Sequence, residues 1–263
     1  MTKRILRQAS IAGAVAAGAA LLAGGVAHAG GDIVTTGNNG IANGNQVVAP
    51  IQAPINVCGN AVGALVGIAG AGCDGGSDAN LESGSLADMV SAGNNGIANG
   101  NQVQAPIQAP INVCGNAVGA LIGVAGAGCD GGSSADIRHG HSAESAKVTE
   151  ASKTPQMVTA GNKGVLNGTQ VAAPIQAPIN VCGNAVAVAG AAGAGCDGGT
   201  KADLGHHAVP DMTSVDNSGI ANGTQIFAPI QLPIDISGNA VGVLGIAGAG
   251  SDGGSTADIG PSR

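Results

Sequence analysis

Apolar and polar residues alternate with a period of two along residues 46–58, where Val47, Ile51, Ile55 and Val57 share one face and Gln46 lies on the other. The alternation predicts a half-buried β-strand. It recurs three more times along the chain, so the same apolar face is expected four times. We predict that this face mediates self-assembly through the following residues: Val47, Ile51, Ile55, Val57, Val103, Ile107, Ile111, Val113, Val171, Ile175, Ile179, Val181, Ile226, Ile230, Ile234 and Ile236.

Two prolines, Pro50 and Pro54, interrupt the polar face of the first strand. Because they lack N–H groups on one lateral side, the pattern favours an edge strand or a partly polyproline-like segment. Gly59-Asn60 then indicates a turn, and a second apolar segment follows at residues 61–71. Its glycines leave helix and strand both open. We expect a strand that pairs with the first one, as in a β-hairpin.

The whole unit is written four times, at residues 37–73, 93–129, 161–196 and, in a degraded form, 217–251. The first two copies are nearly identical: Val66 and Ile68 are exchanged for Ile122 and Val124, and Val48 is replaced by Gln104. Near-identical, β-prone tandem segments of low charge pair readily with each other and between chains. The repetition therefore points to self-association.

Composition excludes an ordinary globular core. The 263 residues include 48 Gly and one Phe, with no Trp or Tyr, so the large side chains that usually fill a core are missing. Apolar content is nevertheless 44% and charged content 10%, which argues against disorder. Small apolar side chains suit layers that approach closely.

Charged residues concentrate between the repeats, at residues 74–92, 130–160 and 197–216, and in the tail at 252–263. We expect the three inner segments to be flexible linkers. Corresponding Cys or Ser positions are separated by 56, 68 and 55 residues, and this uneven spacing favours separate beads over a regular β-solenoid.

Residues 1–29 have the pattern of a secretory signal peptide. Lys3, Arg4 and Arg7 precede an apolar stretch, and Ala27-His28-Ala29 fits a cleavage site before Gly30. An uncleaved anchor is the alternative. Cleavage would change the formal net charge from −7 to −10, and such acidity excludes a phosphate-binding nucleic-acid surface.

Six cysteines form three pairs, Cys58/Cys73, Cys114/Cys129 and Cys182/Cys196, and the fourth repeat has Ser237 and Ser251 in their places. Paired loss is expected when the two cysteines bond to each other in an oxidising compartment, so we predict three disulfides, each within one repeat. A zinc site is the weaker interpretation because no repeat contains Cys-x-x-Cys or His.

These motifs together resemble the chaplin domain of filamentous actinobacteria. The resemblance rests on Asn-Gly-Asn-Gln, the spaced prolines, Pro-Ile-Asn-Val-Cys-Gly-Asn and a second Cys after a Gly/Ala run, and it extends over all four repeats. It implies a secreted, surface-active protein that assembles into amyloid-like films on aerial hyphae and spores. Long chaplins carry two such domains and a sortase sorting signal. This sequence has four repeats and ends in Ile259-Gly260-Pro261-Ser262-Arg263 without an apolar tail.

Other chemistry finds little support in the sequence. His139, His141, His206 and His207 lie in the expected linkers and read as exposed polar residues. The recurring Asp-Gly-Gly-Ser/Thr motif, which begins at Asp74, places oxygens beside glycine turns, as some calcium-binding loops do. It fits neither the EF-hand pattern nor the calcium-binding nonapeptide repeat. We therefore expect no catalytic site, no cofactor and no resident metal.

The sequence thus predicts a mainly β, low-complexity chain of four small tandem β-hairpin-like, amyloid-prone repeats joined by flexible linkers, without a single globular core. The expected function is that of a secreted structural protein of the cell surface or cell wall, not an enzyme. Its expected partners are itself, other chaplin-like proteins, the cell wall and the air–water interface, with no nucleic acid and no membrane after signal cleavage. The alternative is an extracellular binding or adhesion module of the cell wall, with calcium dependence as one form of it.

Overall fold

The computed structural model describes residues 32–82, 86–138, 156–205 and 210–259, and every regular element in these ranges is a β-strand. Each repeat contributes eight strands of matching position, so the mainly β fold with four repeated units is confirmed. Within the described part of the chain, no helix is present that could cross a membrane.

The first two repeats comprise β1 (Ile33–Thr36), β2 (Asn39–Ile41), β3 (Gln46–Val48), β4 (Ile51–Gln52), β5 (Ile55–Cys58), β6 (Ala61–Gly63), β7 (Ile68–Asp74) and β8 (Ser77–Glu82), followed by β9 (Met89–Ala92), β10 (Asn95–Ile97), β11 (Gln102–Gln104), β12 (Ile107–Gln108), β13 (Ile111–Cys114), β14 (Ala117–Ala120), β15 (Val124–Asp130) and β16 (Ser133–Arg138).

The last two repeats comprise β17 (Gln156–Ala160), β18 (Lys163–Val165), β19 (Gln170–Ala172), β20 (Ile175–Gln176), β21 (Ile179–Cys182), β22 (Ala185–Val188), β23 (Ala191–Asp197) and β24 (Thr200–Leu204), followed by β25 (Asp211–Val215), β26 (Ser218–Ile220), β27 (Gln225–Phe227), β28 (Ile230–Gln231), β29 (Ile234–Ser237), β30 (Ala240–Val243), β31 (Ile246–Asp252) and β32 (Ser255–Ile259).

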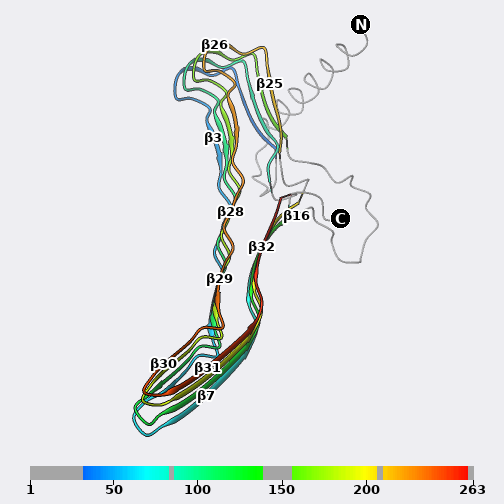
Figure 1. The fold of residues 1–263 in the computed structure, drawn as a ribbon. Helices are drawn as coiled ribbons and strands as arrows, with labels where there is room; N and C mark the ends of the chain where they lie inside the picture. The colour runs from blue at the N-terminus through cyan, green and yellow to red at the C-terminus, as the bar shows by residue number, and fades with distance from the viewer. Residues whose placement is uncertain (1–31, 83–85, 139–155, 206–209, 260–263) are drawn as a thin grey trace, which may run out of the picture.

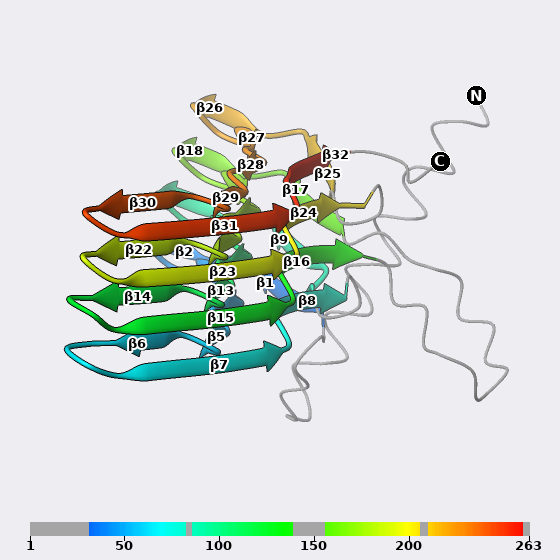
Figure 2. The same cartoon turned by 60° about the horizontal axis from the view of Figure 1, so that its bottom comes forward.

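The repeats stack on one another as four rungs, and each of the eight sheets takes one parallel strand from every repeat (Figure 2). The register is strict. In the sheet β7-β15-β23-β31, for example, Cys73 is opposite Cys129, Cys129 is opposite Cys196, and Cys196 is opposite Ser251. Each backbone therefore pairs with the same sequence position one repeat away.

The expectation of hairpin pairing within a repeat is wrong, and so is the expectation of separate beads. Strands β5 and β7 of one repeat face each other through their side chains instead of sharing backbone hydrogen bonds. Their partners are the equivalent strands of the next repeat. The physical reason is that near-identical repeats place identical side chains above one another, which lets amides form continuous hydrogen-bonded ladders.

Viewed along the stacking direction, each rung is a long, flattened path with two facing layers (Figure 1). Glutamine side chains bridge the layers by donating to backbone carbonyls on the other side. Gln108 Nε2 donates to Asp136 O at 3.1 Å, and Gln176 Nε2 donates to Asp203 O at 3.0 Å. The interior between the layers is consequently polar and hydrogen-bonded at these positions.

Six sets of amide side chains run through the stack in register, and we call them amide ladders. In the Asn43 ladder the backbone N–H of each residue donates to the Oδ1 of the next repeat, whereas the other five include bonds between the side chains themselves. The six ladders contain Asn38, Asn94, Asn162 and Asn217; Asn43, Asn99, Asn167 and Asn222; Gln46, Gln102, Gln170 and Gln225; Gln52, Gln108, Gln176 and Gln231; Asn56, Asn112, Asn180 and Asp235; and Asn60, Asn116, Asn184 and Asn239. Their inner members are buried: Gln102, Gln170, Asn112 and Asn180 have no exposed surface. Buried amides are costly unless they are paired, and the ladder supplies the pairing.

Small apolar residues fill the end of the cross-section near β6 and β7. Ala61, Ala117, Ala125, Ala185, Ala187 and Ala192 form one buried cluster. Alanine allows the two layers to approach closely here, which accounts for the compositional shortage of large side chains. The small-sided core expected from composition therefore takes the form of stacked layers.

The expected linkers also contain strands. Strands β8, β9, β16, β17, β24 and β25 all lie within residues 74–92, 130–160 or 197–216, and they pair in register across repeats. Their larger apolar residues are buried, including Leu81, Met89, Ile137 and Leu204. The flexible-linker expectation is thus wrong for these segments, because sparse apolar residues among charged ones still align into a core once the repeats stack.

The prolines divide the first segment of each repeat into short strands. They do not restrict this segment to the edge of a sheet. In repeat 2, Ile107 N donates to Pro50 O at 3.0 Å, while Pro106 O accepts from Ile175 N at 3.0 Å. The backbone therefore pairs on both sides, with only the missing proline N–H groups lost from the ladder. The edge-strand interpretation is wrong for the inner repeats.

The Asp-Gly-Gly-Ser/Thr motif forms the corner between the two strands of the second layer. A Cβ added to Gly132 would lie 2.1 Å from Gly199 O of the next repeat, so only glycine allows this approach. The following Ser133 Oγ donates to Pro110 O of the facing layer at 2.7 Å. The motif is a structural corner that ties the layers together.

Gln104 is a buried amide that belongs to none of these ladders. Its neighbours in register are Val48 and Ala172, and neither its Nε2 nor its Oε1 has a hydrogen-bond partner. Gln104→Val, which copies repeat 1, should raise the free energy of unfolding by about 1–2 kcal/mol because it removes two unsatisfied polar atoms. Denaturant unfolding measures the change.

Gln102→Val is the matched control two residues away. Gln102 donates to Gln46 Oε1 and accepts from Gln170 Nε2, both at 3.0 Å, so this variant should lower the free energy of unfolding by about 1–3 kcal/mol. Equal effects of the two valines would contradict the assignment of Gln104 as the unsatisfied position.

Candidate functional site

The sixteen residues of the expected self-assembly face lie in a regular array on one outer surface of the stack. Register pairing places them in four ladders of four, which begin at Val47, Ile51, Ile55 and Val57. We call this surface the aliphatic array. It is formed by β3, β4 and β5 and their equivalents in the other three repeats, which make up the middle of one of the two layers (Figure 1).

The aliphatic array points outward and the polar face of the same strands points inward. In repeat 1, at the end of the stack, Val47, Ile51, Ile55 and Val57 are each 66–69% exposed, whereas Gln46 is 6% exposed. The equivalent aliphatic residues of repeats 2 and 3 are half-buried by their stacked neighbours, and the amides that alternate with them are buried. The alternation predicted from sequence is therefore present with its polar side inside. This inversion is stable because amides stacked in register satisfy one another, and isoleucine or valine cannot do so.

The amide ladders fix the layer that carries the aliphatic array. Asn112 Nδ2 donates to Asn180 Oδ1 at 2.9 Å and to Gly131 O of the facing layer at 3.0 Å. Asn112 thus holds both the neighbouring repeat and the opposite layer, and Asn180 does the same through Asp235 Oδ1 and Gly198 O. The exposed aliphatic side chains between the ladders are held in a flat, regular arrangement.

A second group of exposed apolar residues was not identified from sequence. It surrounds the turn between the two layers, where Val66, Ile68 and Leu244 are 83%, 89% and 94% exposed. A sequence signal was available, because Val66/Ile122 and Ile68/Val124 are two of the three positions at which the two near-identical repeats differ. Free exchange of Val and Ile is typical of side chains without close packing partners.

Three disulfides join the layers within repeats 1 to 3, between Cys58 and Cys73, Cys114 and Cys129, and Cys182 and Cys196. The described residues contain no free cysteine. The three bridges stack into a buried cluster. The adjoining glycine of Cys-Gly-Asn has a positive φ of 62° at Gly115, and a Cβ there would lie 2.8 Å from Cys129 Cβ, so the motif requires glycine beside the bridge.

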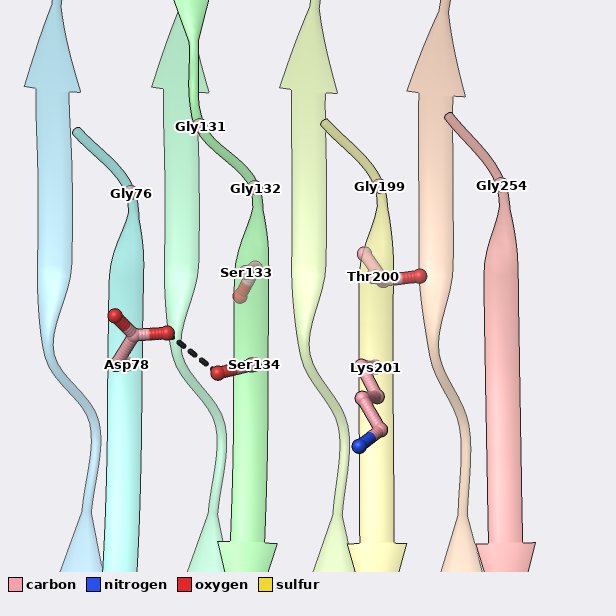
Figure 3. Close-up of a pocket in the computed structure, with 10 residues that line it drawn as sticks. All are labelled: Gly76, Asp78, Gly131, Gly132, Ser133, Ser134, Gly199, Thr200, Lys201 and Gly254. Carbon is pink, nitrogen blue, oxygen red and sulfur yellow. Dashed lines mark hydrogen bonds between the residues drawn. The ribbon is translucent and has the colours of Figure 1, made fainter. Parts of the chain in front are cut away.

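An acidic ladder runs along the opposite layer. Asp74, Asp130, Asp197 and Asp252 are in register and exposed. Beside it lies an open groove of about 410 Å³ that crosses the repeats (Figure 3). It is lined by Gly76, Asp78, Gly131, Gly132, Ser133, Ser134, Gly199, Thr200, Lys201 and Gly254.

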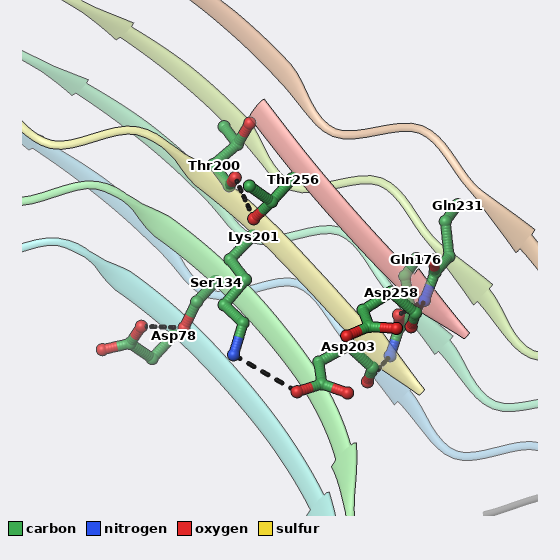
Figure 4. A network of polar contacts seen from close by, with 9 residues as sticks. All are labelled: Asp78, Ser134, Gln176, Thr200, Lys201, Asp203, Gln231, Thr256 and Asp258. Carbon is green, nitrogen blue, oxygen red and sulfur yellow. Dashed lines mark hydrogen bonds and ion pairs between the residues drawn. The ribbon is translucent and has the colours of Figure 1, made fainter. Parts of the chain in front are cut away.

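The polar side chains near this groove contact one another and the backbone of neighbouring repeats (Figure 4). Ser134 Oγ donates to Asp78 Oδ1, and Lys201 Nζ lies 3.2 Å from Asp203 Oδ2. Gln231 Nε2 donates to Asp258 O at 3.0 Å. The Ser134–Asp78 contact joins neighbouring repeats, whereas the other two lie within one repeat.

The groove offers no evident metal centre. Across the described ranges, no group of three or more His, Cys, Asp or Glu is placed to hold a metal ion. The four histidines weighed as ligands and the expected signal peptide lie outside the described residues.

The arrangement defines a class: a structural repeat protein whose rungs are joined by a polar interior and covered on one side by exposed aliphatic residues. The family model ChpA-C, the chaplin domain, matches at residues 8–75, 78–133, 146–201 and 198–256. The chain belongs to the chaplin-domain family.

The chain is also similar to Chaplin-B of Streptomyces coelicolor, with 34% identity in an alignment that covers 38% of this chain and 52% of the relative. The chain therefore spans about half the length of that curated relative. No solved structure matches the chain.

A double substitution tests the contribution of a disulfide. Cys182→Ser with Cys196→Ser reproduces the natural Ser237/Ser251 pair of repeat 4. Because the bridge closes a loop of 14 residues, its loss should lower the free energy of unfolding by about 3 kcal/mol in the chain-entropy model. Denaturant unfolding of the oxidised variant measures this loss, with disulfide-bonded wild-type protein as the reference. An unchanged midpoint would show that stacking alone holds the repeat.

The acidic ladder generates a separate prediction. Like charges directly opposite in a sheet destabilise it, so Asp130→Asn, between Asp74 and Asp197, should stabilise the stack by roughly 0.2–1 kcal/mol at low salt. The gain should shrink as salt screens the remaining repulsion. Thermal unfolding at low and high ionic strength measures both effects. A gain that does not depend on salt would contradict an electrostatic origin.

Proposed function

We propose that this chain is a secreted structural protein of the cell surface that self-assembles through its repeats into an amyloid-like, surface-active film on hyphae or spores. The observation that carries the proposal is the aliphatic array, a broad apolar surface on an otherwise small-sided, rigid stack. Contiguous apolar patches of this kind are rare on soluble monomers and mark interaction surfaces.

The array supplies enough free energy for adsorption. Full burial of a Val or Ile side chain is worth about 1.5–3 kcal/mol. Even about 1 kcal/mol for each partly exposed residue of the array gives on the order of 10 kcal/mol per molecule at an apolar boundary. Adsorption therefore has a strong driving force without any conformational change in the array.

The interior supports the same proposal because it keeps the apolar side chains outside. The Gln and Asn positions form ladders that aliphatic residues cannot replace, and three disulfides fix the two layers. A molecule of this kind cannot hide its apolar surface by turning it inward. Association with air, an apolar solid or other copies is the remaining way to remove that surface from water.

Membership of the chaplin-domain family and the signal-peptide pattern at residues 1–29 support secretion and a place on the cell surface. Homotypic assembly, co-assembly with other chaplin-like proteins and contact with the cell wall belong to the same proposal. An extracellular wall-binding module is the alternative function, and the exposed acidic ladder beside an open groove is the feature that favours it.

Replacing one complete ladder of the array tests the proposal. Ile51→Thr, Ile107→Thr, Ile175→Thr and Ile230→Thr together keep β-branched residues, so the stack should be retained while the surface becomes more polar. We expect the quadruple variant to lower water surface tension less than wild type at equal concentration. Tensiometry measures the effect, and circular dichroism checks the fold.

The matched control carries valine at the same four positions and should keep most of the surface activity. If the threonine variant lowers surface tension as well as the valine variant does, the array is not the adsorbing surface. Wild-type protein that leaves surface tension unchanged but binds wall polymers would favour the alternative function.

A further inference from the structure

The two ends of the stack are open edges, and they are nearly complementary. Every sheet begins with a strand of repeat 1 and ends with a strand of repeat 4, and no described segment covers either end. In five of the six amide ladders, repeat 4 keeps the Asn or Gln of the other repeats: Asn217, Asn222, Gln225, Gln231 and Asn239. A second copy could therefore add its repeat 1 to repeat 4 and continue the register.

One atom at this edge already lacks the partner that such an addition would provide. In the Gln52 ladder, donors point from the later repeat to the earlier one, because Gln231 Nε2 donates to Gln176 Oε1 at 2.8 Å. The Oε1 of Gln231 is buried and has no hydrogen-bond partner. The side chain of Gln52 from a second copy would supply the missing donor.

The sixth ladder opposes the addition. Its donors point the other way: Asn56 Nδ2 donates to Asn112 Oδ1, Asn112 Nδ2 to Asn180 Oδ1, and Asn180 Nδ2 to Asp235 Oδ1, each at 2.9 Å. Each step requires an N–H on the earlier residue. The ladder ends at Asp235, whose carboxylate accepts hydrogen bonds and has none to donate.

The surroundings of Asp235 are adapted to this ending. In repeats 2 and 3 the ladder asparagine donates to the cysteine sulfur two residues on, as Asn180 does to Cys182 Sγ at 2.9 Å. In repeat 4 the direction is reversed, because Ser237 Oγ donates to Asp235 Oδ2 at 3.1 Å. The change from Asn and Cys to Asp and Ser thus gives the carboxylate a partner inside its own repeat.

We propose that Asp235 is a gate residue that blocks end-to-end addition of a second copy, and that repeat 4 is the terminal repeat of the stack. On addition, Asp235 would face Asn56 Oδ1 of the incoming repeat 1, and two acceptors would meet as the carboxylate loses its water. A desolvated charge without a donor is strongly unfavourable. Inward-pointing charges on edge strands protect natural sheets from such pairing.

This inference rests on the proposed function in one respect: it states how a self-associating chain limits growth along its stacking direction. Lateral association through the aliphatic array does not involve Asp235. The gate would therefore favour a film of short stacks over long filaments.

The test compares the mature chain with two single variants that remove the same charge. Asp235→Asn restores the residue of repeats 1 to 3, so it should fold, and its Nδ2 supplies the donor that the ladder requires. Asp252→Asn is the matched control, because Asp252 lies in the same repeat but faces outward and is exposed. Elongation of sonicated fragments by fluorescent monomers gives the rate, and electron microscopy gives length and width.

We expect Asp235→Asn to elongate at least tenfold faster than wild type, with longer assemblies of unchanged width. Asp252→Asn would relieve only the repulsion between Asp252 and Asp74 of the incoming copy, so it should stay within about fivefold. If both variants elongate equally faster, the lower net charge alone explains the acceleration, and the proposal that Asp235 is a gate residue is wrong. Unchanged elongation of Asp235→Asn, or growth in width alone, would also overturn it.

Tensiometry of the same three proteins separates the two proposals, since all of them keep the aliphatic array. Lowered surface tension in all three with equal elongation would refute only the gate. Unchanged surface tension with faster elongation of Asp235→Asn would refute only the surface-active function.

Discussion

Hydrogen bonding between identical amide side chains, stacked in register, is the interaction on which this molecule depends. A buried glutamine is normally costly, yet Gln102 and Gln170 are completely buried because each meets its own counterpart one repeat away. The arrangement requires the same residue at the same place in consecutive repeats. This requirement explains why the repeats are so similar in sequence and why they pair with each other in parallel.

The polar interior determines the rest of the composition. Since amides and small residues occupy the space between the layers, large aromatic side chains have no place there, and alanine forms the apolar part of the core. The aliphatic residues alternate with the amides and are therefore placed outside. An apolar exterior is thus a geometric consequence of an amide interior on a strand of period two.

Sequence patterns were sufficient for the strands, their alternation and the three disulfides, since each depends on local spacing. Which face of the strand is buried could not be predicted from Val47 and Gln46 alone, because the usual rule favours burial of valine. Only the register with Gln102 makes Gln46 the better interior residue. The pairing partner was missed for a related reason: Gly59-Asn60 is compatible with a hairpin turn, and the alternative depends on contacts some 56 residues away.

The segments between the repeats show the same limit. Leu81 and Met89 stand among acidic and small residues, and their local pattern is typical of a solvated linker. They are buried because their counterparts Ile137 and Met157 occupy the adjacent rungs. Local hydrophobicity is too sparse to reveal this core, whereas aligning the repeats and noting the matched apolar positions would have indicated it.

The outer surface of β7 and its equivalents gives the molecule two unlike sides. Gly70, Gly126, Gly193 and Gly248 point outward there into open space, and the aspartate row follows them along the same strands. One broad side of the molecule therefore carries aliphatic rows. The other side, beyond the exposed apolar residues near the turn such as Ile68, presents bare peptide groups and carboxylates that hydrate well. Such a body has a preferred orientation at any boundary, much as a surfactant does, and a layer of these molecules would be wettable on one side and water-repellent on the other.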